Sequence, residues 1–401
     1  MPRIRFAYFG RAGIVLATLL LCSQCAGLTP ALPPPPAIPG CTVVVRAGEP
    51  IDRALATAAP GSSICLEDGL YTPALFTRSG APGAWITLRA VHPGKATIVA
   101  VGQSAQAVNL NGQSFLEVRD LVVEGGAFGI VSSGFAHHTR VIGNEVGFAA
   151  ASGIQLNDGD YRDIEHNRVH DCAKRWSGSG SGISIYHSTA SDHAAGPHNI
   201  VSYNLSYNNA NPPGGTDGNG IIFDDSNHSQ SDNRAYRESS VIEENIVYGN
   251  GGGGINVVHS SNVVVRNNTS YWNHSVTTNK LHWRGELQDE NSAGIVWVNN
   301  IAWASLRFNW RNSATVQAGS ATVWKNNLEF NGLKGINPKL ANPPADMSPR
   351  PGSPAIGAGT SAYGVPETDF DGKPWGAAIG IGAVKLLTAP IPLSYYLTIR
   401  L

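Results

Sequence analysis

The sequence predicts an all-β solenoid, a rod of stacked coils made from short strands. Three observations support this fold class. Asparagine is confined to one block of the chain, it recurs there at a fixed place in a repeated pattern, and the residues between repeats alternate in hydrophobicity. All 31 asparagines of the 401 residues lie between Asn109 and Asn342. A residue type restricted to one block in this way indicates a repeating structure within that block.

The repeated pattern places an asparagine after aliphatic residues and before a small or aliphatic one. Successive copies are 23, 37, 41, 23, 32 and 27 residues apart, which a base period of 23 with insertions at some turns explains. One asparagine per coil predicts a ladder of side-chain amides that bond from coil to coil. About ten coils at ~4.8 Å each would make a rod on the order of 45 Å long. The repeated asparagines are Asn144, Asn167, Asn204, Asn245, Asn268, Asn300 and Asn327.

A second pattern follows the first four of these asparagines. It begins with a glycine and continues with an apolar, a variable and an apolar residue, as at Gly153, Gly182, Gly220 and Gly254. This alternation is typical of a strand with one buried face. Two or three strands per 23 residues, with no helix between them, describe one coil of a solenoid.

The residues before the repeats predict export to the periplasm or the medium. Residues 1–27 read as a signal peptide, with Arg3 and Arg5 ahead of an apolar run that is too short to span a bilayer in a mature protein. Residues 28–40 are rich in proline and suit a stiff linker. The alternative is an outer-membrane lipoprotein anchored through Cys22 or Cys25, which the leucines before Cys22 disfavour.

Export would place the chain where disulfides form, and this makes Cys41 and Cys65 candidates for a bond. Both lie in β-like runs, separated by a short helical pattern from Ile51 to Ala59. The two cysteines could meet if those strands pair side by side. Cys172 is then left as a small buried apolar residue.

Both ends of the repeat region resemble known proteins. The stretch from Ile51 to Val99, with Asp68-Gly-x-Tyr71 inside it, is similar to the N-terminal cap of pectate-lyase-like right-handed parallel β-helix proteins. The far end of the repeat region also resembles these proteins, at Ser353-Pro-Ala-Ile356 and Asp369-Phe-Asp-Gly-Lys373. The resemblance implies a single-stranded right-handed parallel β-helix over residues 41–385, with a short N-terminal capping helix. It implies no single activity, because this superfamily includes lyases, hydrolases, epimerases and binding proteins.

Columns of residues follow from the stacking of coils in register. Residues four positions after the repeated glycines should face outward, and these include Tyr186 and Asp224. The next position begins the following turn and carries an acid, a histidine, an acid and a histidine. An alternative is that these side chains only cap a bend of the backbone. The four residues are Asp158, His187, Asp225 and His259.

Insertions ahead of the same strands should form walls beside this face. Aromatic and cationic side chains beside an acidic centre suit an anionic sugar chain, with rings stacked on Trp and carboxylates paired with Arg or Lys. A further insertion, His274 to Asn291, adds residues near the next turn. The predicted substrate-binding residues are Asp158, Lys174, Arg175, Trp176, Tyr186 and Trp283.

Carboxylates gather most densely at Asp217, Asp224 and Asp225. Their oxygens could hold a hard cation, for which calcium is the candidate, or supply a paired acid and base. The predicted catalytic residues are Asp225, His187, His259, Lys280 and Arg284.

These residues favour an exported polysaccharide lyase that cleaves a uronic-acid-containing glycan by β-elimination. The first alternative is a glycoside hydrolase resembling polygalacturonases, whose Asp-Asp element Asp224-Asp225 matches, although their Gly-His-Gly and Arg-Ile-Lys elements have no counterpart. The second is a non-catalytic glycan-binding rod. A balance of 28 Lys and Arg against 29 Asp and Glu argues against nucleic acid as a partner. The apolar tail at 386–401 is too short and too broken by proline for a helix that spans a membrane, so we expect no membrane span in the mature form. We also expect a monomer.

Overall fold

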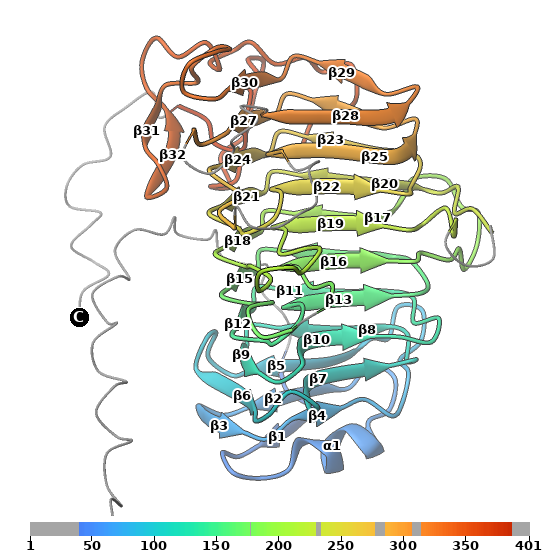
Figure 1. Cartoon of the computed structure of the whole chain (residues 1–401). Helices are drawn as coiled ribbons and strands as arrows, with labels where there is room; N and C mark the ends of the chain where they lie inside the picture. The colour runs from blue at the N-terminus through green and yellow to red at the C-terminus, as the bar shows by residue number, and fades with distance from the viewer. Residues whose placement is uncertain (1–39, 177, 230–233, 277–284, 307–313, 387–401) are drawn as a thin grey trace, which may run out of the picture.

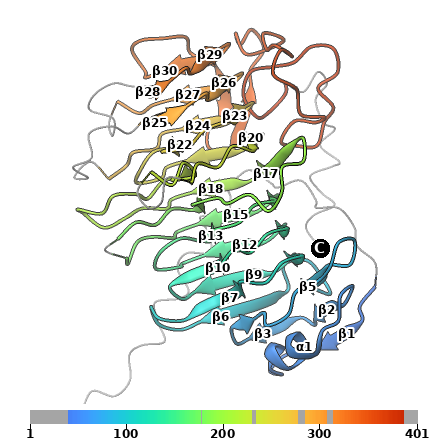
Figure 2. The ribbon, with the colours of Figure 1, turned by 90° about the vertical axis from the view of Figure 1, so that its right-hand side faces the viewer.

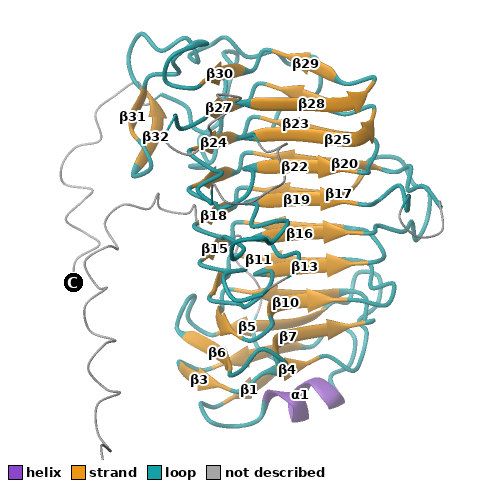
Figure 3. Ribbon diagram, viewed as in Figure 1, coloured by secondary structure: helices purple, strands orange, loops and turns teal. Residues whose placement is uncertain are grey.

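The computed structural model describes residues 40–386, apart from 177, 230–233, 277–284 and 307–313 (Figure 1). The predicted signal peptide, nearly all of the linker and all but the first residue of the tail lie outside the described residues. Three long parallel sheets of eleven, nine and ten strands form a rod. The one helix of the described residues, α1 (Ile51–Thr57), lies at the N-terminal end of the rod, as Figure 3 shows. No helix within these ranges is long and apolar enough to cross a membrane.

The eleven-stranded sheet takes one strand from each coil. Its members are β1 (Val43–Val45), β2 (Ser63–Leu66), β5 (Ile86–Ala90), β8 (Leu116–Arg119), β11 (Thr139–Ile142), β14 (Arg162–Glu165), β17 (Pro197–Ser202), β20 (Ser239–Glu243), β23 (Val263–Arg266), β26 (Val296–Val298) and β29 (Val323–Lys325).

The nine-stranded sheet faces the viewer in Figure 1. Its members are β4 (Ala74–Leu75), β7 (Gln106–Asn111), β10 (Phe128–Ser132), β13 (Ile154–Asn157), β16 (Ile183–Tyr186), β19 (Ile221–Asp224), β22 (Ile255–Val258), β25 (Leu287–Ala293) and β28 (Thr315–Ser320).

The ten-stranded sheet completes each coil. Its members are β3 (Gly69–Tyr71), β6 (Ala96–Ala100), β9 (Val122–Gly125), β12 (Glu145–Gly147), β15 (Arg168–His170), β18 (Leu205–Tyr207), β21 (Ile246–Tyr248), β24 (Thr269–Tyr271), β27 (Ile301–Trp303) and β30 (Leu328–Phe330).

Successive coils stack in register, as Figure 2 shows from the side. In the nine-stranded sheet, Ile154 pairs with Ile183 and Ile183 pairs with Ile221. These isoleucines are fully buried and belong to one apolar core inside the rod. The predicted fold, a right-handed parallel β-helix, is confirmed.

The predicted asparagine ladder runs through the rod. Asn144 Nδ2 donates to Asn167 Oδ1 at 3.1 Å, and the same bond recurs at every later step, ending with Asn300 to Asn327 at 2.9 Å. Each amide oxygen also accepts from the backbone N–H of the asparagine one coil earlier, as Asn167 Oδ1 does from Asn144 at 3.0 Å. The ladder therefore satisfies the backbone groups of this turn from coil to coil.

A second, inner ladder was not predicted. Asn209, Asn250 and Asn273 bond in sequence, with Nδ2 to Oδ1 distances of 3.0 and 2.8 Å. Each lies five residues after an asparagine of the first ladder, a spacing that the sequence displays. Glu286 ends the inner ladder, because its carboxyl accepts from Asn273 Nδ2 at 2.6 Å and from Ser270 Oγ at 2.7 Å.

The repeated glycines are required by close packing against this inner ladder. A Cβ at Gly254 would collide with Ser270 Oγ. Glu286 occupies the equivalent position one coil later and points its side chain into the same space. That coil therefore lacks the glycine that marks the earlier ones.

The N-terminal end of the rod matches the prediction. Cys41 and Cys65 form a disulfide with a Cα to Cα distance of 5.7 Å, beside the paired strands β1 and β2. The predicted helical pattern is α1 (Ile51–Thr57), which buries Ile51 and Leu55 against the first coil. Cys172 is free and fully buried, and burial raises the pKa of its thiol to about 12.

The C-terminal end differs from the expectation of coils up to residue 385. The last coil ends at β30, and residues 331–386 instead pack along the outside of the ten-stranded sheet. This segment contains an antiparallel pair, β31 (Leu340–Asn342) and β32 (Asp346–Pro349). It covers outward apolar side chains of the coils, namely Leu205, Ile246, Ile301 and Leu328. Burial of this column explains why the chain turns back.

Candidate functional site

The predicted outward column lies on the nine-stranded sheet. The register aligns Asn157, Tyr186 and Asp224 on neighbouring strands, and Val258 and Glu290 continue the line. Tyr186 is 37 % exposed and Asp224 is half-buried, whereas the residues next to them in sequence, Ile185 and Phe223, face the core. This alternation follows from the period of two in a strand.

The next column begins the turn, as expected. Asp158, His187, Asp225 and His259 have φ values of 49°, 58°, 48° and 45°, and Asn291 one coil later has 49°. This left-handed conformation suits Asp and Asn better than most residues. The backbone bend therefore explains why Asp occurs at two positions of this column, in line with the alternative that these side chains serve the bend.

Side chains in this turn column have different surroundings. His187 Nδ1 lies 3.0 Å from Asp158 Oδ1, and the His187 ring stacks on His228 at 3.7 Å between centroids. Asp225 is fully buried and accepts a hydrogen bond from Ser229 Oγ at 3.2 Å. His259 Nε2 lies 3.1 Å from Asn291 Nδ2.

Asp224, rather than its neighbour Asp225, presents its carboxyl on the outer face of the sheet. Burial, together with the negative charges of Asp217, Asp225 and Glu290, raises the pKa of Asp224 to about 7. The Oδ1 atom of Asp224 is buried and has no hydrogen-bond partner among the described residues. This carboxyl is therefore poised to exchange a proton near neutral pH.

Polar side chains around Asp224 hold one another in place. Gln155 Nε2 donates to Asn157 Oδ1 at 3.1 Å, and Gln288 Nε2 donates to Glu290 Oε2 at 3.0 Å. Glu290 belongs to strand β25, so the predicted insertion from His274 to Asn291 ends earlier than expected. Its outward position was missed because Glu286 replaces the glycine that marks the other coils.

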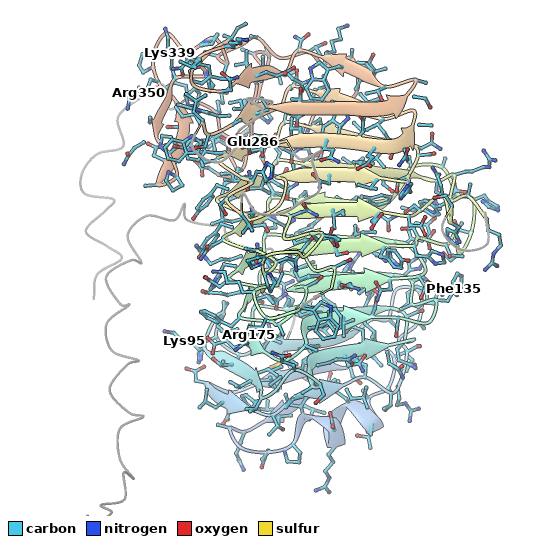
Figure 4. The ribbon with its side chains drawn as sticks, viewed as in Figure 1. Lys95, Phe135, Arg175, Glu286, Lys339 and Arg350 are labelled. Atoms are coloured by element: carbon cyan, nitrogen blue, oxygen red, sulfur yellow. A yellow bond between two sulfur atoms is a disulfide. The ribbon has the colours of Figure 1, made fainter. Side chains whose placement is uncertain are left out.

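The predicted cationic and aromatic wall lies at the opposite edge of the sheet from the turn column. Lys174 Nζ pairs with Asp171 Oδ1 at 2.7 Å, and Arg175 Nη2 donates to the carbonyl of Phe148 at 2.7 Å. Trp176 lies near Phe128, with 6.2 Å between ring centroids. Figure 4 shows Arg175 on the side where the strands begin.

A buried network anchors the segment after β16, at the edge of the turn column. Asp160 accepts from Ser191 Oγ at 2.7 Å and lies 2.8 Å from His198 Nδ1. Tyr161 stacks on His198 at 4.0 Å between centroids. Sequence analysis missed this network because its members are up to 38 residues apart.

Three of the predicted site residues, Lys280, Trp283 and Arg284, lie outside the described residues. Within the described part of the chain, no group of three or more His, Cys, Asp or Glu side chains is placed to hold a metal ion. Of the three predicted ligands, Asp225 is buried and bonded to Ser229, while Asp217 and Asp224 lie close enough for their charges to interact. Calcium binding stays a prediction.

Fold and site together define a parallel β-helix protein with a candidate acid–base centre on the outer face of one sheet. A family model narrows this class. The model of the chondroitinase B family matches residues 45–291, which is more than half of the chain. The chain belongs to the chondroitinase B family and is a polysaccharide lyase, as the sequence favoured.

Several of the solved structures with a similar course of the chain are named as lyases, and others as an epimerase and an alpha-1,3-glucanase. Pectate lyase Pel9A has 13 % identity and a TM-score of 0.49, over 87 % of this chain and 97 % of that chain. An alginate lyase from Paenibacillus sp. str. FPU-7 has 16 % identity and a TM-score of 0.37, over 73 % and 99 %. The PL6 family alginate lyase AlyGC has 17 % identity and a TM-score of 0.32, over 87 % and 59 %. No curated protein matches the chain. The family match therefore carries the functional class.

Proposed function

We propose that this chain is an exported lyase that cleaves a uronic-acid-containing polysaccharide by β-elimination on the outer face of the nine-stranded sheet. The observation that carries this proposal is Asp224, an outward carboxyl with a pKa of about 7 that lies beside Tyr186 in register. Membership of the chondroitinase B family supports the reaction class. The names of the similar structures, pectate lyase and alginate lyase, suggest acidic polymers as substrates to test.

In this mechanism a base removes the proton next to the sugar carboxylate, and the bond to the leaving sugar oxygen breaks as the double bond forms. Protonated Asp224 donates its proton to that departing oxygen. His187 on the coil below and His259 on the coil above are the described candidates for the base. Lys280 and Arg284, which lie outside the described residues, are the proposed source of positive charge for the enolate-like intermediate.

Calcium is an alternative to a proton-donating Asp224. Asp217 and ionised Asp224 are the carboxylates that would hold the ion, because Asp225 is buried, and Asp224 would then not donate a proton. A bound calcium ion would neutralise the carboxylate of the substrate. If so, exhaustive chelation lowers activity and added calcium restores it, whereas activity that survives chelation rules the ion out.

Export is supported by the disulfide between Cys41 and Cys65, because such bonds persist mainly outside the cytoplasm. Loss of residues 1–27 from the mature protein, measured by mass spectrometry of the periplasmic and secreted fractions, tests this part. A chain that stays in the cytoplasm with those residues attached contradicts it.

The test of function is incubation with pectate, alginate and chondroitin sulfates while ultraviolet absorbance is followed. A β-elimination creates a carbon–carbon double bond conjugated with the carboxylate, so absorbance rises with each cleavage. Asp224→Asn should slow the rise by roughly 100-fold or more, whereas Asp68→Asn, which changes an exposed carboxyl at the N-terminal end of the rod, should not. Reducing ends without absorbance would indicate a hydrolase instead, and no turnover on any polymer would indicate a binding protein.

A further inference from the structure

His187 lies directly beside Asp224, at the edge where the strands of the nine-stranded sheet end. The backbone N–H of His187 donates to the carbonyl of Asp224 at 2.9 Å, and Tyr186 is the register partner of Asp224. The turn after β16 therefore begins next to the carboxyl that is proposed as the acid. The side chain of His187 is 17 % exposed, so it is partly open to solvent.

One nitrogen of the His187 ring contacts a carboxylate. Nδ1 of His187 lies 3.0 Å from Oδ1 of Asp158, on the coil below. An ionised carboxylate only accepts hydrogen bonds, so this contact holds a proton on Nδ1 and leaves the lone pair of the neutral ring on Nε2. Asp158 is held in turn, because its Oδ2 accepts from the backbone N–H of Gly134 at 3.4 Å and its carbonyl accepts from Arg162 Nη2.

The ring of His187 is also supported from the coil above. His228 is buried and stacks on His187 at 3.7 Å between ring centroids, with 25° between the planes. Nε2 of His228 lies 2.8 Å from the carbonyl of Ser188, which anchors that ring to the turn. Contacts from two coils therefore limit the rotation of His187. The titratable side chains around His187 among the described residues are Asp158, Tyr186, Asp224, Asp225 and His228.

His259, the other candidate for the base, is held differently. Its Nε2 lies 3.1 Å from Nδ2 of Asn291. An amide nitrogen only donates, so the lone pair of Nε2 in His259 already accepts this hydrogen bond. A proton taken up at that nitrogen would break the bond to Asn291. The two arrangements favour His187 as the group that accepts a proton.

We propose that Asp158 is the positioning residue that makes His187 the base of the elimination. This inference rests on the proposed function. Nε2 of His187 takes the proton next to the sugar carboxylate, the electron pair of that C–H bond forms the double bond, and the bond to the leaving oxygen breaks. Asp158 keeps the ring in the required tautomer, and its negative charge stabilises the imidazolium that forms.

The experiment follows ultraviolet absorbance against pH on pectate, alginate and chondroitin sulfate. Asp158→Asn should lower kcat roughly tenfold or more with little change in KM, because an amide can donate to Nδ1 and hold the wrong tautomer. A base must be neutral, so the rate falls at acidic pH. Loss of the carboxylate disfavours the imidazolium, and this acidic limb should therefore move to lower pH. Asp158→Glu keeps the charge and should leave the limb near its place in the parent.

Removal of the ring tests whether Asp158 acts through it. His187→Gly should lower kcat roughly 100-fold or more and abolish the acidic limb, and added imidazole should restore part of the rate. In this background Asp158→Asn should cause no further loss. Both replacements suit the left-handed backbone, which has φ of 49° at Asp158 and 58° at His187.

Asp68→Asn is the matched control. Oδ1 of Asp68 lies 2.9 Å from Nδ1 of His92, so the same kind of pair is present at the N-terminal end of the rod. This variant should keep the kcat, the KM and the pH profile of the parent. Thermal unfolding of every variant shows whether its fold is retained.

The tautomer of His187 provides a readout that needs no turnover and no substitution of Asp158. Nitrogen NMR of protein labelled at its histidines should find the proton of neutral His187 on Nδ1, with the signals identified by their loss in His187→Gly. A proton on Nε2 would overturn the proposal.

Kinetic outcomes separate this inference from the proposed function. The inference alone is overturned if the parent cleaves a polymer and Asp158→Asn keeps the parent rate and acidic limb. A higher KM at unchanged kcat in Asp158→Asn would assign Asp158 to substrate binding and would also overturn it. A folded parent that raises no absorbance on any polymer overturns the proposed function, and the catalytic role of the pair with it.

Discussion

Asp224 and Asp225 show how strongly the environment of a carboxyl group can differ between two adjacent residues. Asp224 ends a strand and faces outward, whereas Asp225 begins the turn with a φ of 48° and is fully buried. The sequence analysis assigned the catalytic role to Asp225. Hydrophobic alternation could not show that its side chain is buried, because the pattern does not describe the direction of a side chain on a left-handed residue. The structure therefore moves the proposed acid to Asp224.

The pH profile of activity tests Asp224. If it donates a proton to the leaving group, it must be protonated, so kcat should fall as pH rises through its pKa of about 7. Asp224→Asn should lower kcat by roughly 100-fold or more and remove that limb of the profile. Asp224→Glu should retain some activity. A profile whose alkaline limb is unchanged in Asp224→Asn would contradict this role.

Glu244 is a buried carboxyl outside the site. Burial raises its pKa well above the ordinary value, and the charges of Glu243 and Asp369 act in the same direction. Its Oε1 accepts from Trp375 Nε1 at 2.8 Å, which joins the coils to the C-terminal segment. Folding therefore favours the protonated form of Glu244, and its contribution to stability is lost as pH rises from its unfolded pKa towards the folded one.

Glu244→Gln should therefore stabilise the protein at neutral and alkaline pH. Glutamine keeps an acceptor for Trp375 without having to retain a proton, and we expect a gain of roughly 1 kcal/mol or more at pH 8, because one pKa unit corresponds to about 1.4 kcal/mol. At pH 4 the gain should vanish. Calorimetric Tm values at both pH values provide the measurement, with Glu124→Gln on β9 as the control. Equal shifts at both pH values would argue against this account.

At the scale of elements, the two asparagine ladders define the turns. Asn245 in the middle of the first ladder donates to Asn268 Oδ1 at 2.9 Å and to the carbonyl of Val201 at 2.8 Å, and it accepts from Asn204. Asn327 at the end accepts from Asn300 and donates to the carbonyl of Trp297. The middle of the ladder therefore has more bonds to lose.

Asn245→Ala should cost about 3 kcal/mol or more of unfolding free energy, because several buried partners lose their bonds at once. Asn327→Ala should cost less, about 1 kcal/mol, since Asn327 itself is only partly buried and makes fewer bonds. Denaturant titrations of the two variants beside the parent compare the costs. Equal losses would mean that the ladder does not act through its buried bonds.

Local patterns made the first ladder, the strands after the glycines and the disulfide predictable. Asn245 follows aliphatic residues that mark its place, and Cys65 lies in a run that reads as a strand. The inner ladder was equally visible five residues later. The position of Glu286 was not, because only the packing around Ser270 shows why a charged residue can replace a glycine.

The placement of the walls was less predictable still. The insertion with Lys174 precedes a strand of the sheet, whereas His187 follows it, so the two lie at opposite edges. The order of these residues along the chain already implied opposite edges. The sequence analysis nevertheless placed both in a single groove. Contacts such as Asp160 with His198 join separate coils and have no local signature.

At the scale of the whole molecule, the rod is covered at one end and along one side. The N-terminal end has α1 and the disulfide, and residues 331–386 return along the outside of the ten-stranded sheet. That segment removes apolar side chains of several coils from water. We therefore expect the returning segment to be required for a soluble fold.

Truncation after Phe330 should lower the Tm strongly and increase binding of a hydrophobic dye, because it uncovers Leu205, Ile246, Ile301 and Leu328. Truncation after Lys385, which removes the predicted tail alone, is the matched control and should leave both measurements near the parent values. A stable, dye-silent protein that ends at Phe330 would show that the coils need no cover.

The spacing between ladder asparagines varies while their bonds do not. Asn144 and Asn167 are 23 residues apart and Asn204 and Asn245 are 41 apart, yet the amides bond at 3.1 and 3.0 Å. The pitch of the rod is thus independent of how much chain is inserted at the turns. Such a scaffold can acquire new recognition loops without any change to its core, and a designer could graft foreign segments into the turn between β18 and β19 or the turn between β19 and β20 for the same reason.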